Sequence, residues 1–213
     1  MKKTLIVAAT LEELAPLYSH FGWQPAKLVE HLDFDLLITG VGMTATAFEI
    51  GRQLSDRYDL VLNVGIAGSF DRTIPLGTVV NVTHDTFAEL GAEDGENFIG
   101  IDQLGYGKGS YQSSFKLTNK LVNELPLVKG ITVNTVHGNS RSIEKVLARL
   151  DVQTESMEGA AVYYACEQMN IPTLQVRSIS NYVERRNRAH WEIGLAIKNL
   201  NDWLISFLNA NFA

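Results

Sequence analysis

The sequence predicts an α/β fold: a single three-layer α/β/α domain over residues 1–213, built on a mixed, largely parallel, twisted central sheet. First, short apolar runs of strand length alternate with longer segments of helical period. Second, residues 5–9 are almost all apolar, which is typical of a strand buried on both faces. Third, 213 residues without a linker or an internal repeat suit one domain.

The elements can be placed in order along the chain. Strands are expected at residues 5–9, 32–39, 60–64, 78–82, 131–136 and 173–179, and helices at 11–20, 43–54, 158–169 and 191–208. The last helix carries one apolar stripe and should dock on the sheet through Ile193, Ile197, Leu200, Leu204 and Leu208. Residues 91–114 are rich in glycine and predict a mobile loop of functional importance.

Composition excludes several classes of function. A net charge of −6 leaves no basic surplus for a nucleic-acid polymer. No apolar run approaches the roughly 20 residues that span a bilayer, and Glu12 and Glu13 interrupt the apolar N-terminal stretch, which favours a first strand over a signal peptide. The single cysteine, Cys166, fits a cytoplasmic protein without disulfides. No cluster of Cys and His suggests a metal, and no cofactor is expected.

Two glycine-rich segments follow predicted strands. Residues 40–45 match the letters of a dinucleotide-binding turn, but Asn63 stands near the end of the next strand, where that motif requires an acid. A tight strand-to-helix turn is therefore the favoured interpretation. Residues 63–69 place Gly65 and Gly68 after a buried strand, where they form either a structural turn or a backbone cradle for a ligand.

Two acidic motifs stand beside predicted helices. Thr10 and Glu13 have the spacing of a capping box, and a carboxylate at the end of a strand can also polarise a water molecule. Residues 155–161 bring an acid to the start of an apolar helix. That acid either complements the helix dipole or faces a site and accepts hydrogen bonds from sugar hydroxyls.

The last predicted strand ends in a polar cluster over residues 175–184. Arg177 lies within the strand, where an arginine is costly unless it is paired, so a structural ion pair is favoured over ligand contact. Arg185, Arg186 and Arg188 follow at once. They form either a solvated basic loop or an anchor for a substrate carboxylate.

In this order the motifs resemble the purine nucleoside phosphorylase and nucleosidase superfamily over nearly the whole chain. Residues 63–72, 87–95 and 178–184 are most similar to its futalosine hydrolase branch. The resemblance implies hydrolysis of the N-ribosidic bond of futalosine, which releases hypoxanthine and dehypoxanthine futalosine in menaquinone biosynthesis. The implied partner is a small purine nucleoside, with no metal or cofactor.

The resemblance also assigns roles to individual residues. Glu13 matches the position that holds the attacking water, and Glu158 matches the acid that binds the ribose hydroxyls. Asn181 stands where adenine-specific nucleosidases carry aspartate. The remaining substrate-binding positions that it implies are Met157, Ser180, Ile66, Ala67, Gly68, Val136 and His137.

Asn181 indicates which base is bound. Adenine presents one acceptor and one donor, N7 and the 6-amino group, which suit a carboxylic acid. Hypoxanthine presents two acceptors, N7 and O6, and an asparagine amide can donate to both. The wrong base would leave a buried polar group unpaired, at a cost of about 1–3 kcal/mol. The sequence therefore predicts a 6-oxopurine ligand.

The nucleophile is expected to be water rather than phosphate. Phosphorylases of this superfamily hold phosphate with arginines and a glycine-rich turn, whereas residues 9–13 here carry Glu12 and Glu13. Asn63 and Ile66 replace an arginine and a serine of those enzymes. Carboxylates repel phosphate but suit a water molecule.

Other functions remain open from the sequence. The main alternative is a methylthioadenosine/S-adenosylhomocysteine nucleosidase, and a further one is a non-catalytic nucleoside-binding protein. The resemblance implies a homodimer or higher homo-oligomer in which a hydrophobic loop covers the neighbour's site. Phe98 and Tyr106 are the candidates for that lid.

Overall fold

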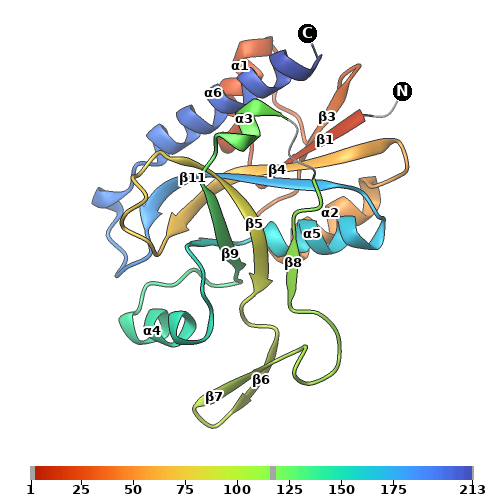
Figure 1. The fold of residues 1–213 in the computed structure, drawn as a ribbon. Helices are drawn as coiled ribbons and strands as arrows, with labels where there is room; N and C mark the ends of the chain where they lie inside the picture. Colours follow the sequence, from red (N-terminus) through yellow and green to blue (C-terminus); the bar gives the residue numbers. More distant parts are fainter. Residues whose placement is uncertain (1–2, 116–118, 213) are drawn as a thin grey trace.

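The computed structural model describes residues 3–115 and 119–212, and it confirms a mixed α/β fold with one central sheet between helices (Figure 1). Its strands are β1 (Lys3–Ala8), β2 (Leu28–Glu30), β3 (Phe34–Ile38), β4 (Tyr58–Ser69), β5 (Val79–Phe87), β6 (Gly91–Asp94), β7 (Asn97–Gly100), β8 (Ser110–Gln112), β9 (Leu127–Thr132), β10 (Thr154–Ser156) and β11 (Thr173–Tyr182). Its helices are α1 (Ala15–Phe21), α2 (Met43–Gln53), α3 (Lys120–Asn123), α4 (Ser140–Arg149), α5 (Gly159–Gln168) and α6 (Ile193–Phe212), with 3-10 turns η1 (Glu12–Leu14) and η2 (Arg188–His190). The terminal residues 1, 2 and 213 of the predicted domain lie outside the described residues.

The central sheet is mixed and partly closes on itself. Its strand order is β10-β9-β5-β11-β4-β1-β3-β2, with β8 on β5. Parallel pairings join β3, β1, β4 and β11, as predicted for the alternating part of the chain. The short strand β10 pairs with β9 on one side and with β4 on the other. The strands β4, β11, β5, β9 and β10 therefore form a closed ring beside the open part of the sheet.

Helices cover both faces of the open part of the sheet. Strand β1 shows why its sequence is apolar throughout: Ile6 packs into a cluster with α1 and α6, and Leu5 packs into another with α2 and α5 (Figure 1). In α6, Leu200 and Leu204 are fully buried, which confirms the docking of this part of the predicted stripe, whereas Ile193 at its start is exposed. Burial of both faces of a strand removes any polar alternation, so β1 carries no signal of sidedness.

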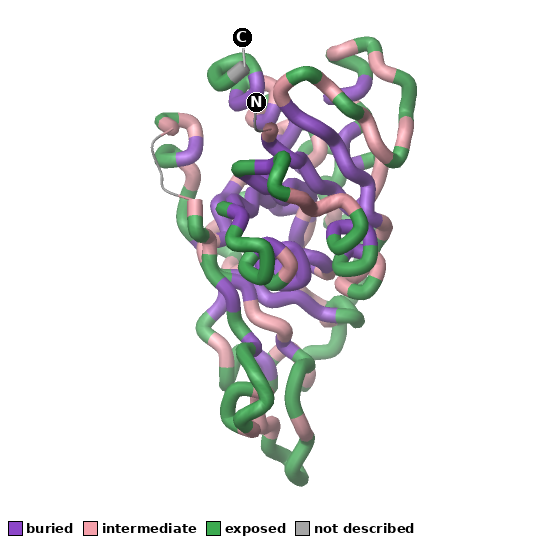
Figure 2. Tube along the Cα trace, turned by 90° about the vertical axis from the view of Figure 1, so that its right-hand side faces the viewer, coloured by how far each residue is buried: buried purple, intermediate pink, exposed green. Residues whose placement is uncertain are grey.

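The prediction of one long loop over residues 91–114 is wrong for residues 91–100 and 110–112, which form strands and a hairpin, whereas residues 101–109 connect them without helix or strand. Strands β6 and β7 form a hairpin, and β8 pairs with β5. Gly95 has φ +62°, so it occupies the first position of a two-residue hairpin turn after Asp94. The hairpin projects from the body of the protein, and the projecting end in Figure 2 is mostly exposed or half-buried.

Several predicted boundaries also need correction. The predicted helix at 11–20 begins as the 3-10 turn η1, and the predicted strand at 32–39 is the hairpin strand β3, preceded by β2. Strand β4 runs to Ser69, so Gly65 and Gly68 are strand residues rather than a turn. Strand β9 ends at Thr132, four residues before the predicted end at 136, and α4 and β10 were not predicted. Strand β10 is too short for a periodic pattern.

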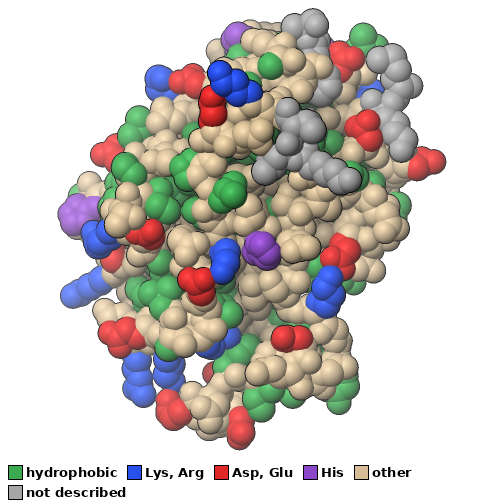
Figure 3. Space-filling view, in the orientation of Figure 1, with side chains coloured by type: hydrophobic (Ala, Val, Ile, Leu, Met, Phe, Trp, Pro, Cys, Tyr) green, Lys and Arg blue, Asp and Glu red, His purple; other side chains and the backbone are tan. Residues whose placement is uncertain are grey.

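Surface and helix properties bear on possible partners. Acidic and basic side chains are interspersed over the face shown in Figure 3, so no surface of one sign dominates there. Over residues 3–115 and 119–212, none of the helices combines the length and apolar character needed to cross a membrane.

Candidate active site

A cavity of about 410 Å³ opens at the carboxyl ends of β1 and β11, where α/β sheets commonly bind ligands. The site residues predicted from the sequence all line it: Glu13, Ile66, Ala67, Gly68, Val136, His137, Met157, Glu158, Ser180 and Asn181. Further lining residues that were not predicted as site residues include Thr10, Val41, Glu155, Arg186 and Trp191. Segments from both ends of the chain thus meet at one place.

Glu13 is a buried carboxylate with a fixed orientation. Its Oε2 accepts hydrogen bonds from the backbone N–H of Thr10 at 3.0 Å and from the Thr10 hydroxyl at 3.2 Å. The backbone N–H of Glu13 donates to Thr10 Oγ1 at 3.3 Å, so the reciprocal bonds of the predicted capping box are present. Its Oε1 accepts from the N–H of Ile66 at 3.0 Å. Glu13 therefore has both roles that the sequence allowed: it completes the capping box and it lines the cavity.

Burial dominates the electrostatics of Glu13. Desolvation raises the pKa of this carboxyl above its usual range, although the charge of Arg177 and the N–H of Ile66 oppose that rise. The nearby charge of Glu158 raises the pKa further. A carboxylate with a raised pKa accepts a proton more readily, which suits a general base.

Arg177 lies beneath the cavity and is 1 % exposed. Its Nη2 is 3.9 Å from Glu158 Oε2, which confirms the predicted ion pair. Gly65 makes the arrangement possible: a Cβ at this position would overlap Arg177 Nη1 and would lie 2.7 Å from Glu13 Oε1. Nε and Nη2 of Arg177 have no hydrogen-bond partner among the described residues. The guanidinium of Arg177 therefore interacts electrostatically with the carboxylates of both Glu158 and Glu13.

Glu158 is held by backbone donors just before α5. The N–H of Gly42 donates to Oε1 at 2.9 Å, and the N–H of Met157 donates to Oε2 at 3.3 Å. Gly42 has φ +95°, a conformation that favours glycine. Residues 40–45 therefore act as a tight turn that orients a carboxylate, in line with the interpretation favoured over a dinucleotide site.

Asn181 presents its amide at the end of β11. The Ser180 hydroxyl lies 2.9 Å from Asn181 Oδ1 and 3.2 Å from the carbonyl oxygen of Ala67. The amide Nδ2 donates to the carbonyl oxygen of Tyr182 at 3.1 Å. One amide hydrogen is thus engaged and one is left for a ligand, whereas the sequence argument required both hydrogens.

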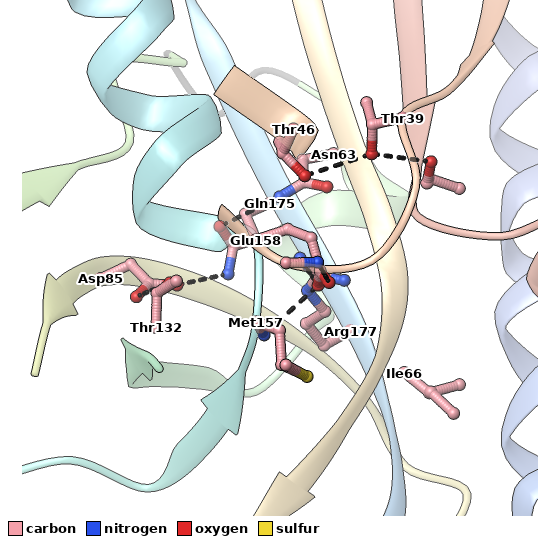
Figure 4. A network of polar contacts seen from close by, with 12 residues as sticks. Thr39, Thr46, Asn63, Ile66, Asp85, Thr132, Met157, Glu158, Gln175 and Arg177 are labelled. Atoms are coloured by element: carbon pink, nitrogen blue, oxygen red, sulfur yellow. Dashed lines mark hydrogen bonds and ion pairs between the residues drawn. The ribbon is translucent and has the colours of Figure 1, made fainter. Parts of the chain in front are cut away.

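A buried polar network supports the start of α5 (Figure 4). Asp85 accepts hydrogen bonds from Gln175 Nε2 and from the Thr132 hydroxyl, each at 2.8 Å. Thr132 Oγ1 accepts from the N–H of Ala160 at 2.7 Å. Burial raises the pKa of Asp85 to about 6. The network fixes the first turn of α5 and therefore the position of Glu158, which immediately precedes that turn.

Sequence reasoning missed this network and one further pair. Asp85, Thr132 and Gln175 lie on three strands and have no local pattern in common. Glu155 lines the cavity and accepts hydrogen bonds from the backbone and the ring of His137. The motif at residues 155–161 indicated only the acid at the helix start, Glu158. The contact of Glu155 with a loop residue leaves no periodic signal in the sequence.

Other predicted functional residues are distributed differently. Of the arginine run, Arg186 lines the cavity, while Arg185 and Arg188 do not. Phe98 packs against Arg149, whose guanidinium carbon is 4.0 Å from the ring centroid, and Tyr106 is 82 % exposed. Neither aromatic residue lines the cavity of its own chain. Their covering of a neighbouring subunit's site stays a prediction.

The fold and this cavity define an α/β protein with an acidic, partly buried small-molecule site. No group of three or more His, Cys, Asp or Glu side chains that could hold a metal occurs in the part of the chain described. The chain belongs to the phosphorylase superfamily, whose family model matches residues 35–208.

Within this superfamily, similar proteins include futalosine hydrolases and methylthioadenosine/S-adenosylhomocysteine nucleosidases. The chain is 33% identical over 178 residues to futalosine hydrolase from Streptomyces coelicolor, which covers 79% of this chain and 76% of that protein. It is 26% identical over 209 residues to 5'-methylthioadenosine/S-adenosylhomocysteine nucleosidase from Bacillus subtilis, with 88% and 89% covered. The solved structure of a futalosine hydrolase mutant from Helicobacter pylori has a TM-score of 0.83 at 17% identity and covers 99% of this chain and 100% of that one.

Proposed function

We propose that this protein hydrolyses the N-ribosidic bond of futalosine with water as nucleophile, releasing hypoxanthine within menaquinone biosynthesis. The observation that carries the proposal is the meeting of Glu13, Glu158 and an amide, Asn181, along one cavity. The similarity to the futalosine hydrolase from Streptomyces coelicolor supports the choice of substrate.

The proposed mechanism passes through an oxocarbenium-like transition state. Glu13 orients a water molecule and takes its proton, a role that its raised pKa favours. Glu158, fixed by the N–H groups of Gly42 and Met157, binds ribose hydroxyls and offsets the positive charge that develops on the sugar. Asn181 donates to the departing base and stabilises its negative charge.

The direct test compares four nucleosides. The protein is incubated with futalosine, inosine, methylthioadenosine and S-adenosylhomocysteine, with and without phosphate, and the free base and sugar products are identified. Release of hypoxanthine from futalosine without a requirement for phosphate is expected. Release of adenine alone would establish the alternative, a methylthioadenosine/S-adenosylhomocysteine nucleosidase, which the relative from Bacillus subtilis favours. No cleavage of any nucleoside would support a binding protein.

Asn181→Asp is expected to lower kcat/KM for the 6-oxopurine nucleoside by about 10- to 100-fold, because a carboxylate repels O6 and removes a donor. The same change should raise activity toward a 6-aminopurine nucleoside. Steady-state kinetics with both nucleosides checks the prediction. Full turnover of the 6-oxopurine by this variant would refute the donor role of Asn181.

Activity should depend on pH through Glu13. The ionised carboxylate is the base, so kcat/KM should fall as the pH drops through its pKa. Because burial raises that pKa, the fall should begin at a higher pH than the ordinary glutamate value of 4.5. A pH–rate profile, with folding checked by circular dichroism at each pH, tests this. A profile that stays flat down to the ordinary range would contradict it.

We further propose a cytoplasmic homo-oligomer in which each chain of 213 residues acts as one domain. Apolar side chains are exposed on α2, on α5 and on the turn before α2, with Phe48 at 61 %, Tyr164 at 45 % and Val41 at 57 % exposure. Such a surface is typical of association. Sedimentation that detects only a 23.6 kDa species would contradict the oligomer.

A further inference from the structure

We propose that the purine base binds between Asn181 and His137, and that His137, held by Glu155, donates a second hydrogen bond to the base at O6. This inference rests on the proposed function, because it names the part of the site that recognises the 6-oxopurine. It assigns a specificity-determining role to a histidine–glutamate pair.

The pairing of three strands places these groups around one glycine. Gly68 on β4 lies opposite Glu155 of β10 on one side and opposite Asn181 of β11 on the other. Residues opposite each other in neighbouring strands present their side chains to the same face of a sheet. With strands about 4.8 Å apart, the backbones of β10 and β11 are roughly 10 Å apart across β4, which leaves room for a flat ring system.

The absence of a side chain at Gly68 makes room for the amide of Asn181. A Cβ at this position would lie 2.9 Å from Val183 Cγ2 and 3.2 Å from Asn181 Nδ2. Its direction shows that the missing side chain belongs to the same face as the amide of Asn181. Gly68 lines the cavity together with Asn181, Glu155 and His137. The amide of Asn181 and the imidazole of His137 can therefore both contact a base bound in this cavity.

Glu155 determines which nitrogen of His137 faces a ligand. One carboxylate oxygen accepts the backbone N–H of His137 at 2.9 Å, and the other forms a short contact with ring Nδ1. The Glu155 side chain is 3 % exposed, and His137 is its ion-pair partner in the described chain. With Nδ1 directed at Glu155, Nε2 is the ring nitrogen left for a ligand.

The surroundings favour the charged form of His137. The hydrogen bond to Glu155 raises the pKa of the imidazole, and the charge of Glu89 acts in the same direction. Burial and the charge of Arg149 act in the opposite direction. Arg186 stands at the edge of the same loop, with its Cβ 4.0 Å from the position of a Cβ on Gly138. In the charged form Nε2 carries a hydrogen and can only donate.

Recognition of hypoxanthine requires a second hydrogen-bond donor besides the free amide hydrogen of Asn181. The Hoogsteen edge of hypoxanthine has two acceptors, and Asn181 has one free amide hydrogen because the other is bound to Tyr182. His137 supplies the missing hydrogen at O6. An imidazolium also stabilises negative charge that builds on the departing base, more strongly than a neutral amide does. The 6-amino group of adenine would instead meet a donor.

The test measures binding of free hypoxanthine and free adenine to the full chain by calorimetry. His137→Gln is expected to weaken hypoxanthine binding by about 10- to 100-fold, the effect of losing a hydrogen bond with a charged partner. Adenine binding should not weaken, because the donor that opposes its 6-amino group is removed. His84→Gln is the matched control, because His84 is an exposed histidine of β5 outside the cavity. Hypoxanthine binding by His137→Gln at the level of the unaltered protein would overturn the inference.

Glu155→Gln separates the charge of His137 from its mere presence. In the unaltered protein, hypoxanthine binding should weaken as the pH rises through the raised pKa of His137. In Glu155→Gln this weakening should occur at lower pH, because the charge that stabilises the imidazolium is gone. A role of Glu155 in structure alone would leave the midpoint unchanged, and that result would overturn the inference.

A third test uses NMR on the unaltered protein, so its result does not depend on whether a variant folds. The ring protons of His137 should report a raised pKa by NMR, and their resonances should shift when hypoxanthine is added. The absence of any shift would overturn the inference even if futalosine is cleaved. If hypoxanthine binds through His137 but futalosine is not cleaved, the proposed function fails and the base site stands.

Discussion

Glu13→Gln is expected to lower kcat by about 10³-fold, within the range that loss of a general base produces. The substitution keeps the size of the side chain but removes its charge and its capacity to take a proton from water. KM should change only a few-fold, because the groups proposed to bind the base and the ribose, Asn181 and Glu158, are untouched. Single-turnover release of hypoxanthine measures the effect.

The local structure predicts that this variant stays folded. Glu13 receives hydrogen bonds on both oxygens, from Ile66 on one and from Thr10 on the other, so the amide of glutamine loses one of them. Thermal unfolding should shift by only a few degrees, the size expected for one hydrogen bond. Glu144→Gln on the exposed side of α4 serves as the control with unchanged activity. Normal turnover by Glu13→Gln would remove this residue from the chemistry.

Gly159→Ala is expected to destabilise the protein by about 3 kcal/mol, at the upper part of the range for overpacking a core. A Cβ at Gly159 would overlap Asp85 Oδ2 and would lie 2.5 Å from Gln175 Nε2. Neither neighbour can yield easily, because both are buried and hydrogen-bonded to each other. For a chain of this length the midpoint of thermal unfolding should fall by roughly 6–12 °C.

Gly51→Ala is the matched control for that substitution. Gly51 lies within α2, and a Cβ there would meet no atom within 4 Å. Alanine is favoured over glycine in a helix by up to about 1 kcal/mol, so this variant should be as stable as the unaltered protein or slightly more stable. Equal unfolding midpoints for Gly159→Ala and Gly51→Ala would show that the network beneath α5 is not tightly packed.

Local patterns explain what could be predicted from the sequence. Two features depend only on neighbouring residues and appear where expected. They are the capping box at Thr10 and Glu13 and the polar end of β11 at Asn181. The α/β class follows from alternation of strand and helix periods along the chain. These features depend on short-range preferences, so the sequence carries them directly.

Distant contacts explain what could not be predicted. Gly65 and Gly68 suggested a turn, yet they lie within β4, where the absence of their side chains makes room for Arg177 and Asn181. The contact of His137 with Glu155 likewise joins the loop after β9 to the short strand β10. The hairpin turn at Gly95 and Glu96, with glycine at its first position, is a local signal that the sequence carries and that the prediction of a loop missed.

The closure of the ring by β10 makes catalytic competence a property of the complete native state. The hydrogen bond that holds Glu158 reaches Gly42 across 116 residues, and the one that holds Glu13 reaches Ile66 across 53. Contacts of such sequence separation form late in folding because long loops must close first. Turnover is therefore a sensitive reporter of full assembly, and it should vanish in the same transition that melts the fold.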